Sequence, residues 1–172
     1  MTTDLAESIR DIPDFPKPGI LFKDITTLLK DGRLFRASID GLVAAIGPRR
    51  VNVVVGMESR GFIFGAPIAY ALGVGFVPVR KLGKLPAEVV SVEYDLEYGS
   101  ATLEMHKDAI APGARVLIVD DLLATGGTVA GTIELVRRLG GEIVCLAFLI
   151  ELEALRGRDR LPGHEIVSLL RF

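Results

Sequence analysis

Residues 116–128 read Val-Leu-Ile-Val-Asp-Asp-Leu-Leu-Ala-Thr-Gly-Gly-Thr, a pattern of strand, acidic turn and helix start. The apolar run 116–119 predicts a strand that is covered on both faces, as in a parallel sheet. The small residues after the two carboxylates predict a turn that opens a helix. Because ligands of open α/β sheets bind at the carboxyl ends of strands, this stretch predicts a binding site.

The turn has the composition of a phosphate site. Its residues are Ala124, Thr125, Gly126, Gly127 and Thr128. The two glycines allow successive backbone N–H groups to point at one position, where the next helix adds the positive end of its dipole, and the threonine hydroxyls are further donors. Asp120 and Asp121 would repel a second phosphate, so we expect them to meet sugar hydroxyls or a cation that arrives with the ligand. A ribose 5-phosphate satisfies both parts, whereas a plain connection would leave paired acids without partners.

Length and composition indicate one globular domain over residues 1–172. The chain has 49% hydrophobic and 24% charged residues and a formal net charge of −2, which gives no global reason to expect nucleic acid or an anionic membrane as a partner. No apolar run approaches the roughly 20 residues of a membrane-spanning helix, and the start of the chain is not typical of a signal peptide. The single cysteine, Cys145, excludes an intramolecular disulfide, so a cytoplasmic location is the default expectation.

Strands and helices are predicted to alternate along the chain. This alternation predicts an α/β fold with a central, mainly parallel sheet that is flanked by helices. The predicted helices cover residues 34–46, 62–72 and about 129–139, with a short amphipathic helix over 2–10. The predicted strands cover residues 51–55, 75–79, 89–92, 101–106, 116–119 and 143–150.

The stretch 116–128 resembles the phosphoribosyl pyrophosphate (PRPP) signature of the type I phosphoribosyltransferases, in the version found in their adenine-specific members. The likeness extends over about residues 13–172. It implies the type I fold, with a flexible hairpin lid and a small N-terminal hood mainly over residues 1–27. It also implies transfer of the phosphoribosyl group from PRPP to adenine, Mg²⁺ that is bound through PRPP rather than by a site of the protein, and a homodimer. Asp120, Asp121 and the turn 124–128 then bind the ribose and its 5-phosphate.

A second strand end carries Gly-Met-Glu-Ser-Arg-Gly at residues 56–61. From the residues alone, Arg60 is either a surface or capping residue or an anion ligand. The resemblance implies that Ser59 and Arg60 contact pyrophosphate, because Glu-Ser-Arg-Gly is the family's pyrophosphate loop. It also implies a cis peptide bond between Glu58 and Ser59.

Three cations, Arg80, Lys81 and Lys84, follow the strand predicted over 75–79. Such a run is commonly a solvated edge. The resemblance implies instead that these cations neutralise the pyrophosphate leaving group. A nucleic-acid surface is disfavoured, because no aromatic residues interleave the cations.

The proline-rich segment 14–24 cannot form a regular helix and carries two phenylalanines into a loop. Its apolar residues either plug the space under a long loop or form a hood over a base. The resemblance implies that Phe22 stacks on adenine, that the backbones of Leu21 and Lys23 read the edge of the base, and that Leu155 packs on its opposite face.

Residues 93–100 predict a long polar connection between two strands. Taken alone, Glu97 is a solvated acid. The resemblance of Leu-Glu-Tyr-Gly (96–99) to the family's lid implies that Glu97 is catalytic, moving a proton at the imidazole ring of the purine, and that Tyr98 covers the reaction centre.

Two alternatives remain open at this point. One is a sister enzyme that acts on hypoxanthine, guanine or xanthine, which would need edge contacts of opposite donor and acceptor sense. The other is a regulator that binds PRPP without turnover. The lid and pyrophosphate-loop residues favour an enzyme, and we expect no DNA-binding extension in this chain.

Overall fold

The computed structural model describes residues 2–96 and 99–172. The chain divides into two compact units, Met1–Gly41 and Leu42–Phe172. None of the helices in these described ranges is long and apolar enough to cross a membrane. The assignment of residues 1–172 to a single domain, with a hood mainly over 1–27, stays a prediction.

The first unit contains a short two-stranded sheet and the helices around it. Its elements are α1 (Thr2–Glu7), β1 (Arg10–Pro13), β2 (Leu21–Asp24), α2 (Thr26–Leu29) and the start of α3 (Gly32–Ile46). The prediction of a helix over 2–10 is wrong at its end, because the Ser8 hydroxyl donates to the carbonyl of Leu5 (2.7 Å) and the chain then enters β1. The prediction that 14–24 forms no regular helix is confirmed, but Phe22 lies on the extended strand β2 rather than in a loop.

The second unit is built on a mainly parallel sheet, as predicted. Among the described residues this sheet has seven strands in the order β5-β6-β4-β3-β7-β8-β9. Five adjacent strands are parallel to one another, namely β4, β3, β7, β8 and β9. At the other edge of the sheet, β6 is antiparallel to both β4 and β5. The elements are β3 (Val53–Met57), α4 (Gly61–Leu72), β4 (Gly75–Lys81), β5 (Val89–Leu96), β6 (Gly99–His106), β7 (Arg115–Leu123), α5 (Gly127–Arg138), β8 (Glu142–Glu151), the 3₁₀ turns η1 (Glu153–Leu155) and η2 (Gly157–Arg160), and β9 (Ile166–Arg171).

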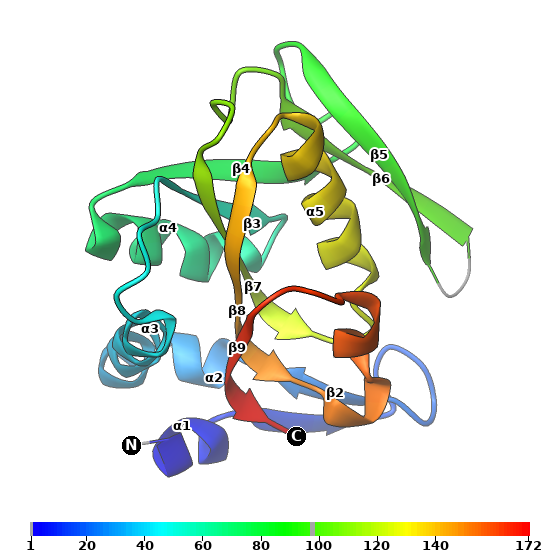
Figure 1. Ribbon diagram of the computed structural model, residues 1–172. Coiled ribbons are helices and arrows are strands. Elements are labelled where there is room, and N and C mark those ends of the chain that lie inside the picture. The colour runs from blue at the N-terminus through cyan, green and yellow to red at the C-terminus, as the bar shows by residue number, and fades with distance from the viewer. Residues whose placement is uncertain (1, 97–98) are drawn as a thin grey trace. The chain divides into compact units, whose positions relative to one another are not determined.

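The two crossover helices cover opposite faces of this sheet (Figure 1). From β3 the chain passes through α4 to β4 on one side, and from β7 it passes through α5 to β8 on the other. Crossovers of one hand that run in opposite directions leave their helices on opposite faces. The order therefore reverses between β3 and β7, and this switch point is where open α/β sheets bind ligands. The core beneath it is aliphatic, with Val55, Val79, Ile118, Val136 and Leu146 all fully buried.

Two predictions for the second unit need correction. The polar connection over 93–100 is wrong in length, because β5 and β6 continue to pair as far as Leu96 and Gly99. On this extended ladder the Ser100 hydroxyl donates to Glu93 Oε1 at 2.5 Å. The sequence analysis also assigns no element to β9, which forms the outer parallel strand beside β8.

Candidate functional site

Two loops diverge from neighbouring parallel strands at the switch point. The loop 58–60 follows β3, and the turn 124–126 follows β7. These strands pair in parallel as far as Gly56 and Val119, so both loops follow the same edge of the sheet, although β7 continues beyond the end of β3 to Leu123. The structure therefore brings together the two stretches that the sequence analysis assigned to pyrophosphate and to ribose 5-phosphate.

The two carboxylates lie on strand β7 itself. The prediction of an acidic loop after residue 119 is wrong, because β7 continues along β8, with Asp120 beside Phe148 and Leu122 beside Ile150. A strand fixes the backbone more firmly than a loop does. The carboxylates are consequently held at a defined place beside the phosphate turn.

Asp120 lies against the first residue of α4. A Cβ atom on Gly61 would be 2.8 Å from Asp120 Oδ1, so only glycine lets the helix start this close. The N–H of Asp121 donates to the same oxygen at 2.9 Å. Burial and the neighbouring charge of Asp121 raise the pKa of Asp120 well above its ordinary value.

Asp121 forms an ion pair with Arg60. The Arg60 Nε atom is 2.8 Å from Asp121 Oδ2; the aspartate side chain is 6% exposed and that of the arginine 39%. Burial raises the pKa of Asp121, and the guanidinium of Arg60 opposes this rise. Arg60 is the residue before α4, but its side chain faces the carboxylate across the switch point.

Glu58 connects the loop after β3 with the cations of β4. No role is predicted for this residue from the sequence. Its Oε2 atom accepts hydrogen bonds from the backbone N–H of Lys81 (3.1 Å) and from Arg80 Nε (3.2 Å). These two donors hold the pKa of Glu58 below its ordinary value. The predicted cis peptide bond between Glu58 and Ser59 is confirmed, and Ser59 is exposed.

The cation stretch begins on β4 and ends in a turn. Arg80 and Lys81 pair with β6, opposite Glu104 and Leu103, while Lys84 is exposed in the turn. The buried carboxylate of Glu104 accepts the N–H of Gly83 at 2.8 Å and so holds this turn. In addition, Arg80 Nη1 donates to the carbonyl of Lys84 at 3.2 Å. The side chain of Arg80 and the backbone of the turn are therefore held at this strand end, from which the exposed side chains of Lys81 and Lys84 extend.

The turn 124–126, which is predicted to bind phosphate, has the backbone geometry that its glycines suggested. Gly126 has a φ of 81°, in the left-handed region, and α5 begins at the next residue. Glycine has no side chain to cap the helix, so position 126 leaves the first N–H groups of α5 to a ligand. The turn lines a cavity of about 80 Å³ together with Asp120, Leu122 and Val129.

The residues assigned to adenine lie in different parts of the chain. Leu21, Phe22 and Lys23 belong to β2. The rings of Phe22 and Phe15 meet edge to face, with 5.2 Å between their centroids. Lys23 Nζ lies 2.6 Å from Asp11 Oδ1. Leu155 ends η1 and is exposed. The catalytic candidates Glu97 and Tyr98 lie outside the described residues.

Comparison with known proteins identifies the family. The model of the phosphoribosyl transferase domain family matches residues 27–167. An adenine phosphoribosyltransferase from Clostridium perfringens is 61% identical over 168 residues, which are 98% of each chain. This chain belongs to the adenine phosphoribosyltransferase family.

Solved adenine phosphoribosyltransferases share its fold. The enzyme from Thermoanaerobacter pseudethanolicus is 55% identical, with a TM-score of 0.98 and full coverage of both chains. That from Saccharomyces cerevisiae, solved with adenine and an imino-altritol bisphosphate, is 42% identical, with a TM-score of 0.92 over 98% of this chain and 97% of its own. The type I phosphoribosyltransferase fold expected from the sequence is therefore confirmed.

Within this adenine phosphoribosyltransferase fold, sequence reasoning missed the residues that support the site. Glu58 and Glu104 contact cations and turns that lie 20 or more residues away, and nothing local marks them. Gly157 was also missed, although a Cβ atom there would lie 2.2 Å from the carbonyl oxygen of Ala124. In the described ranges, no group of three or more His, Cys, Asp or Glu side chains is placed to hold a metal ion.

Proposed function

We propose that the protein transfers the 5-phosphoribosyl group of PRPP to adenine and releases AMP and pyrophosphate. The observation that carries this proposal is the arrangement at the switch point, where the turn after β7, the partly buried Asp120, the buried Asp121 and the cation of the neighbouring loop converge. The yeast relative, whose structure holds adenine and a sugar-like bisphosphate, supports the same pairing of ligands.

The turn after β7 binds the 5-phosphate and the strand itself binds the sugar. Backbone N–H groups of 124–128 and the start of α5 donate to the phosphate oxygens. Asp120 and Asp121 accept hydrogen bonds from the ribose hydroxyls. Their negative charge also favours the positive charge that develops at C1′ as its bond to pyrophosphate breaks.

The cations beside β3 and β4 hold the leaving group. Arg60, Arg80, Lys81 and Lys84 neutralise the charge that pyrophosphate gains, and the Ser59 hydroxyl donates to it. Glu58 orients this group, because it binds Arg80 and the backbone of Lys81 together. Mg²⁺ bound with PRPP adds further charge neutralisation, and carboxylates such as Asp120 and Asp121 are oxygen donors suited to that ion or to its waters.

The base is proposed to bind to residues of β2 and η1. Phe22 presents an aromatic ring for stacking, the backbones of Leu21 and Lys23 donate and accept at the edge of the base, and Leu155 adds an exposed apolar contact. Glu97 moves the proton of the imidazole ring while N9 attacks C1′, and Tyr98 covers the reaction centre.

Helix α4 supports the homodimer that the family implies. It is apolar around its whole circumference, whereas a helix with one free face usually carries polar residues there. Phe64 and Ile68 are buried, but Tyr70 is 90% exposed. Exposed apolar surface of this kind is typical of interfaces. Light scattering of Tyr70→Glu and of the unsubstituted protein over a range of concentrations tests this interface. If both proteins form dimers that dissociate at the same concentration, the role of α4 in the interface is contradicted.

A cytoplasmic location is also part of the proposal. The single cysteine, Cys145, is buried in β8 and unpaired. Burial raises the pKa of its thiol and so keeps it unreactive. A reducing compartment agrees with this cysteine usage.

The deciding experiment offers PRPP and Mg²⁺ with adenine, hypoxanthine, guanine or xanthine in separate assays of the purified protein, following nucleotide and pyrophosphate. AMP and pyrophosphate in equal amounts from adenine alone are expected. Turnover of a 6-oxopurine would refute the base assignment, and PRPP binding without any product would refute catalysis.

A further inference from the structure

An ion pair with a buried carboxylate and a partly exposed guanidinium lies directly beside the turn proposed to bind the 5-phosphate. Glu151, the last residue of β8, is aligned with Leu123, the residue before the turn, and is 5% exposed. Arg158 of η2 binds both of its carboxylate oxygens, through Nε at 2.5 Å and Nη2 at 2.7 Å. Such a two-point contact fixes orientation as well as distance. The pKa of Glu151 is accordingly held below its ordinary value by Arg158.

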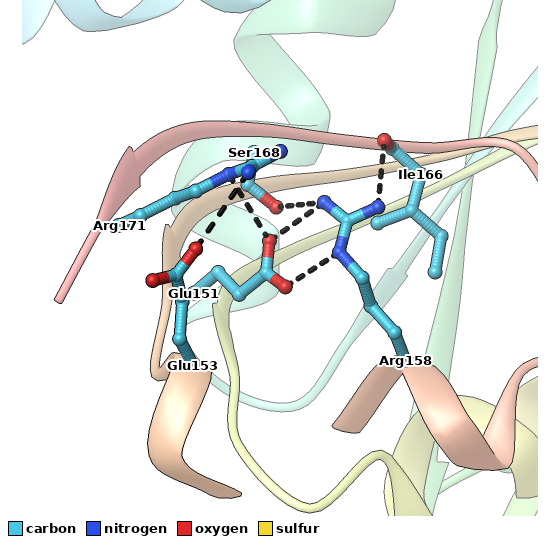
Figure 2. A network of polar contacts seen from close by, with 6 residues as sticks. All are labelled: Glu151, Glu153, Arg158, Ile166, Ser168 and Arg171. Carbon is cyan, nitrogen blue, oxygen red and sulfur yellow. Dashed lines mark hydrogen bonds and ion pairs between the residues drawn. The ribbon is translucent and has the colours of Figure 1, made fainter. Parts of the chain in front are cut away.

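Arg158 also reaches strand β9. Its Nη1 donates to the carbonyl of Ile166 and its Nη2 to Ser168 Oγ, both at 3.4 Å (Figure 2). Figure 2 shows its guanidinium with the carboxylate of Glu151 and the side chain of Ser168 on one side and the carbonyl of Ile166 on the other. One side chain therefore fastens η2 to the ends of two adjacent parallel strands.

The other side of η2 touches the phosphate turn. A Cβ atom on Gly126 would be 2.7 Å from the carbonyl oxygen of Gly157, and one on Gly157 would be 2.2 Å from the carbonyl oxygen of Ala124. Both positions are glycine, so the two backbones are in direct contact. Any displacement of η2 is consequently transmitted to the turn at van der Waals range.

We propose that Arg158 is a positioning residue for the 5-phosphate turn, acting through Gly157, with Glu151 as its anchor. This inference rests on the proposed function of that turn in binding the 5-phosphate of PRPP. A buried ion pair is a poor device for stability alone, because apolar residues of similar volume often stabilise as well or better. Its value here is geometric, because backbone donors that are about 1 Å out of place lose much of their effect on a bound phosphate.

The test measures two ligands separately by calorimetry. Ribose 5-phosphate probes the phosphate turn, while inorganic pyrophosphate probes the cations of the other two loops. We expect Arg158→Gln to weaken ribose 5-phosphate binding about tenfold or more while pyrophosphate binding changes less than about twofold. Arg158→Lys, which keeps the charge but loses the two-point contact, should lie between this variant and the unsubstituted protein.

Arg171→Gln is the matched control. Arg171 also approaches Glu151, with Nε 3.7 Å from Oε2, but it belongs to β9 and not to η2. Its substitution should leave both affinities unchanged. Melting curves of all variants establish that they are folded before binding is measured.

The outcomes separate this inference from the function on which it rests. If the unsubstituted protein binds ribose 5-phosphate and Arg158→Gln binds it equally well, the positioning role is refuted and the proposed function stands. If the unsubstituted protein does not bind ribose 5-phosphate, both fall. An equal loss for both ligands, or unfolding of both Arg158 variants, would show that the pair serves the whole fold and would also overturn the positioning role.

Discussion

Arg60 Nε lies 2.8 Å from Asp121 Oδ2, so the cation proposed for pyrophosphate and the carboxylate proposed for ribose are joined directly. The pair connects the loop after β3 with strand β7, the two sides of the switch point. It also moderates the raised pKa of Asp121. A single substitution should therefore affect both halves of the PRPP site.

Arg60→Gln should lower kcat/KM for PRPP by about 100-fold, because it removes a charge from the leaving-group site. It should also change the pH profile. The negative charge of Asp121 favours the positive charge that develops at C1′, and loss of Arg60 raises the pKa of Asp121 further. Activity should therefore begin to fall at a higher pH on acidification. Steady-state rates across pH test both effects. The control is Lys107→Gln, which breaks the exposed ion pair with Glu88. If the acidic side of the pH–rate profile of Arg60→Gln coincides with that of the unsubstituted protein, the coupling of Arg60 to Asp121 is contradicted.

Glu97→Gln should lower turnover by about 10²- to 10⁴-fold, the usual contribution of a general acid or base. The amide keeps the size of the side chain, so affinity for AMP should stay within about twofold of the original. Single-turnover rates and AMP titrations separate the two quantities. Normal turnover in this variant would exclude Glu97 from the chemistry.

Asp120→Asn should stabilise the ligand-free protein while it abolishes most activity. Burial raises the pKa of Asp120, so the charged form of its carboxyl lowers the free energy of unfolding. This loss of stability begins as the pH rises through the ordinary aspartate range and is complete above the raised pKa. Removing the charge should add about 1 kcal/mol of stability, or about 2–4 °C in Tm for a chain of this size. Thermal unfolding at neutral pH checks this, and a lower Tm would show that the charge is well compensated.

Gly61→Ala should impair PRPP use, because the new methyl group would lie 2.8 Å from Asp120 Oδ1 and 3.1 Å from the carbonyl of Val119. We expect kcat/KM for PRPP to fall about tenfold or more through displacement of the carboxylate. Gly75→Ala is the matched control, since its methyl group would meet only Val53 Cγ2 at 3.9 Å. Equal kinetics in the two variants would argue against the close approach.

Glu151→Gln should destabilise the protein at neutral pH by about 2 kcal/mol, less than for a fully buried pair because the side chain of Arg158 is 36% exposed. The pKa of Glu151 is lowered in the folded state, so its contribution is complete above the ordinary value of 4.5 and is lost as the pH falls through the lowered one. The difference in the free energy of unfolding between the variant and the original protein, measured in urea, should therefore become smaller below about pH 4.5. Glu134→Gln, at an exposed pair with Arg138, should cost less than about 0.5 kcal/mol. A difference that does not change with pH would contradict the ionic account.

The parts of this molecule that sequence reasoning predicted are those with local signals. Glycines at 126 and 127 after a buried apolar run indicate a tight turn that opens a helix, and α5 begins at Gly127. The helix that ends at Ile46 and the strand β8 follow from short-range periodicity in the same way. These features depend on residues within one turn or one strand of each other.

The parts that it missed depend on partners far along the chain. Arg80 lies on a strand rather than in a loop because β6 pairs with it, and Arg158 finds its carboxylate on β8. The length of the β5–β6 hairpin depends likewise on cross-strand pairs such as Glu93 with Ser100. Charge runs look alike in sequence whether they are solvated or tethered, so only the fold distinguishes them.

The division of the chain into two units has an evolutionary consequence. Every residue proposed to hold PRPP belongs to Leu42–Phe172, whereas Leu21, Phe22 and Lys23, proposed for the base, belong to Met1–Gly41. By these proposed roles, sugar-phosphate transfer and most of the choice of base are encoded on separate segments of the chain. Exchange of the segment before α3 would then alter most of the residues proposed for the base while it preserved those proposed for PRPP.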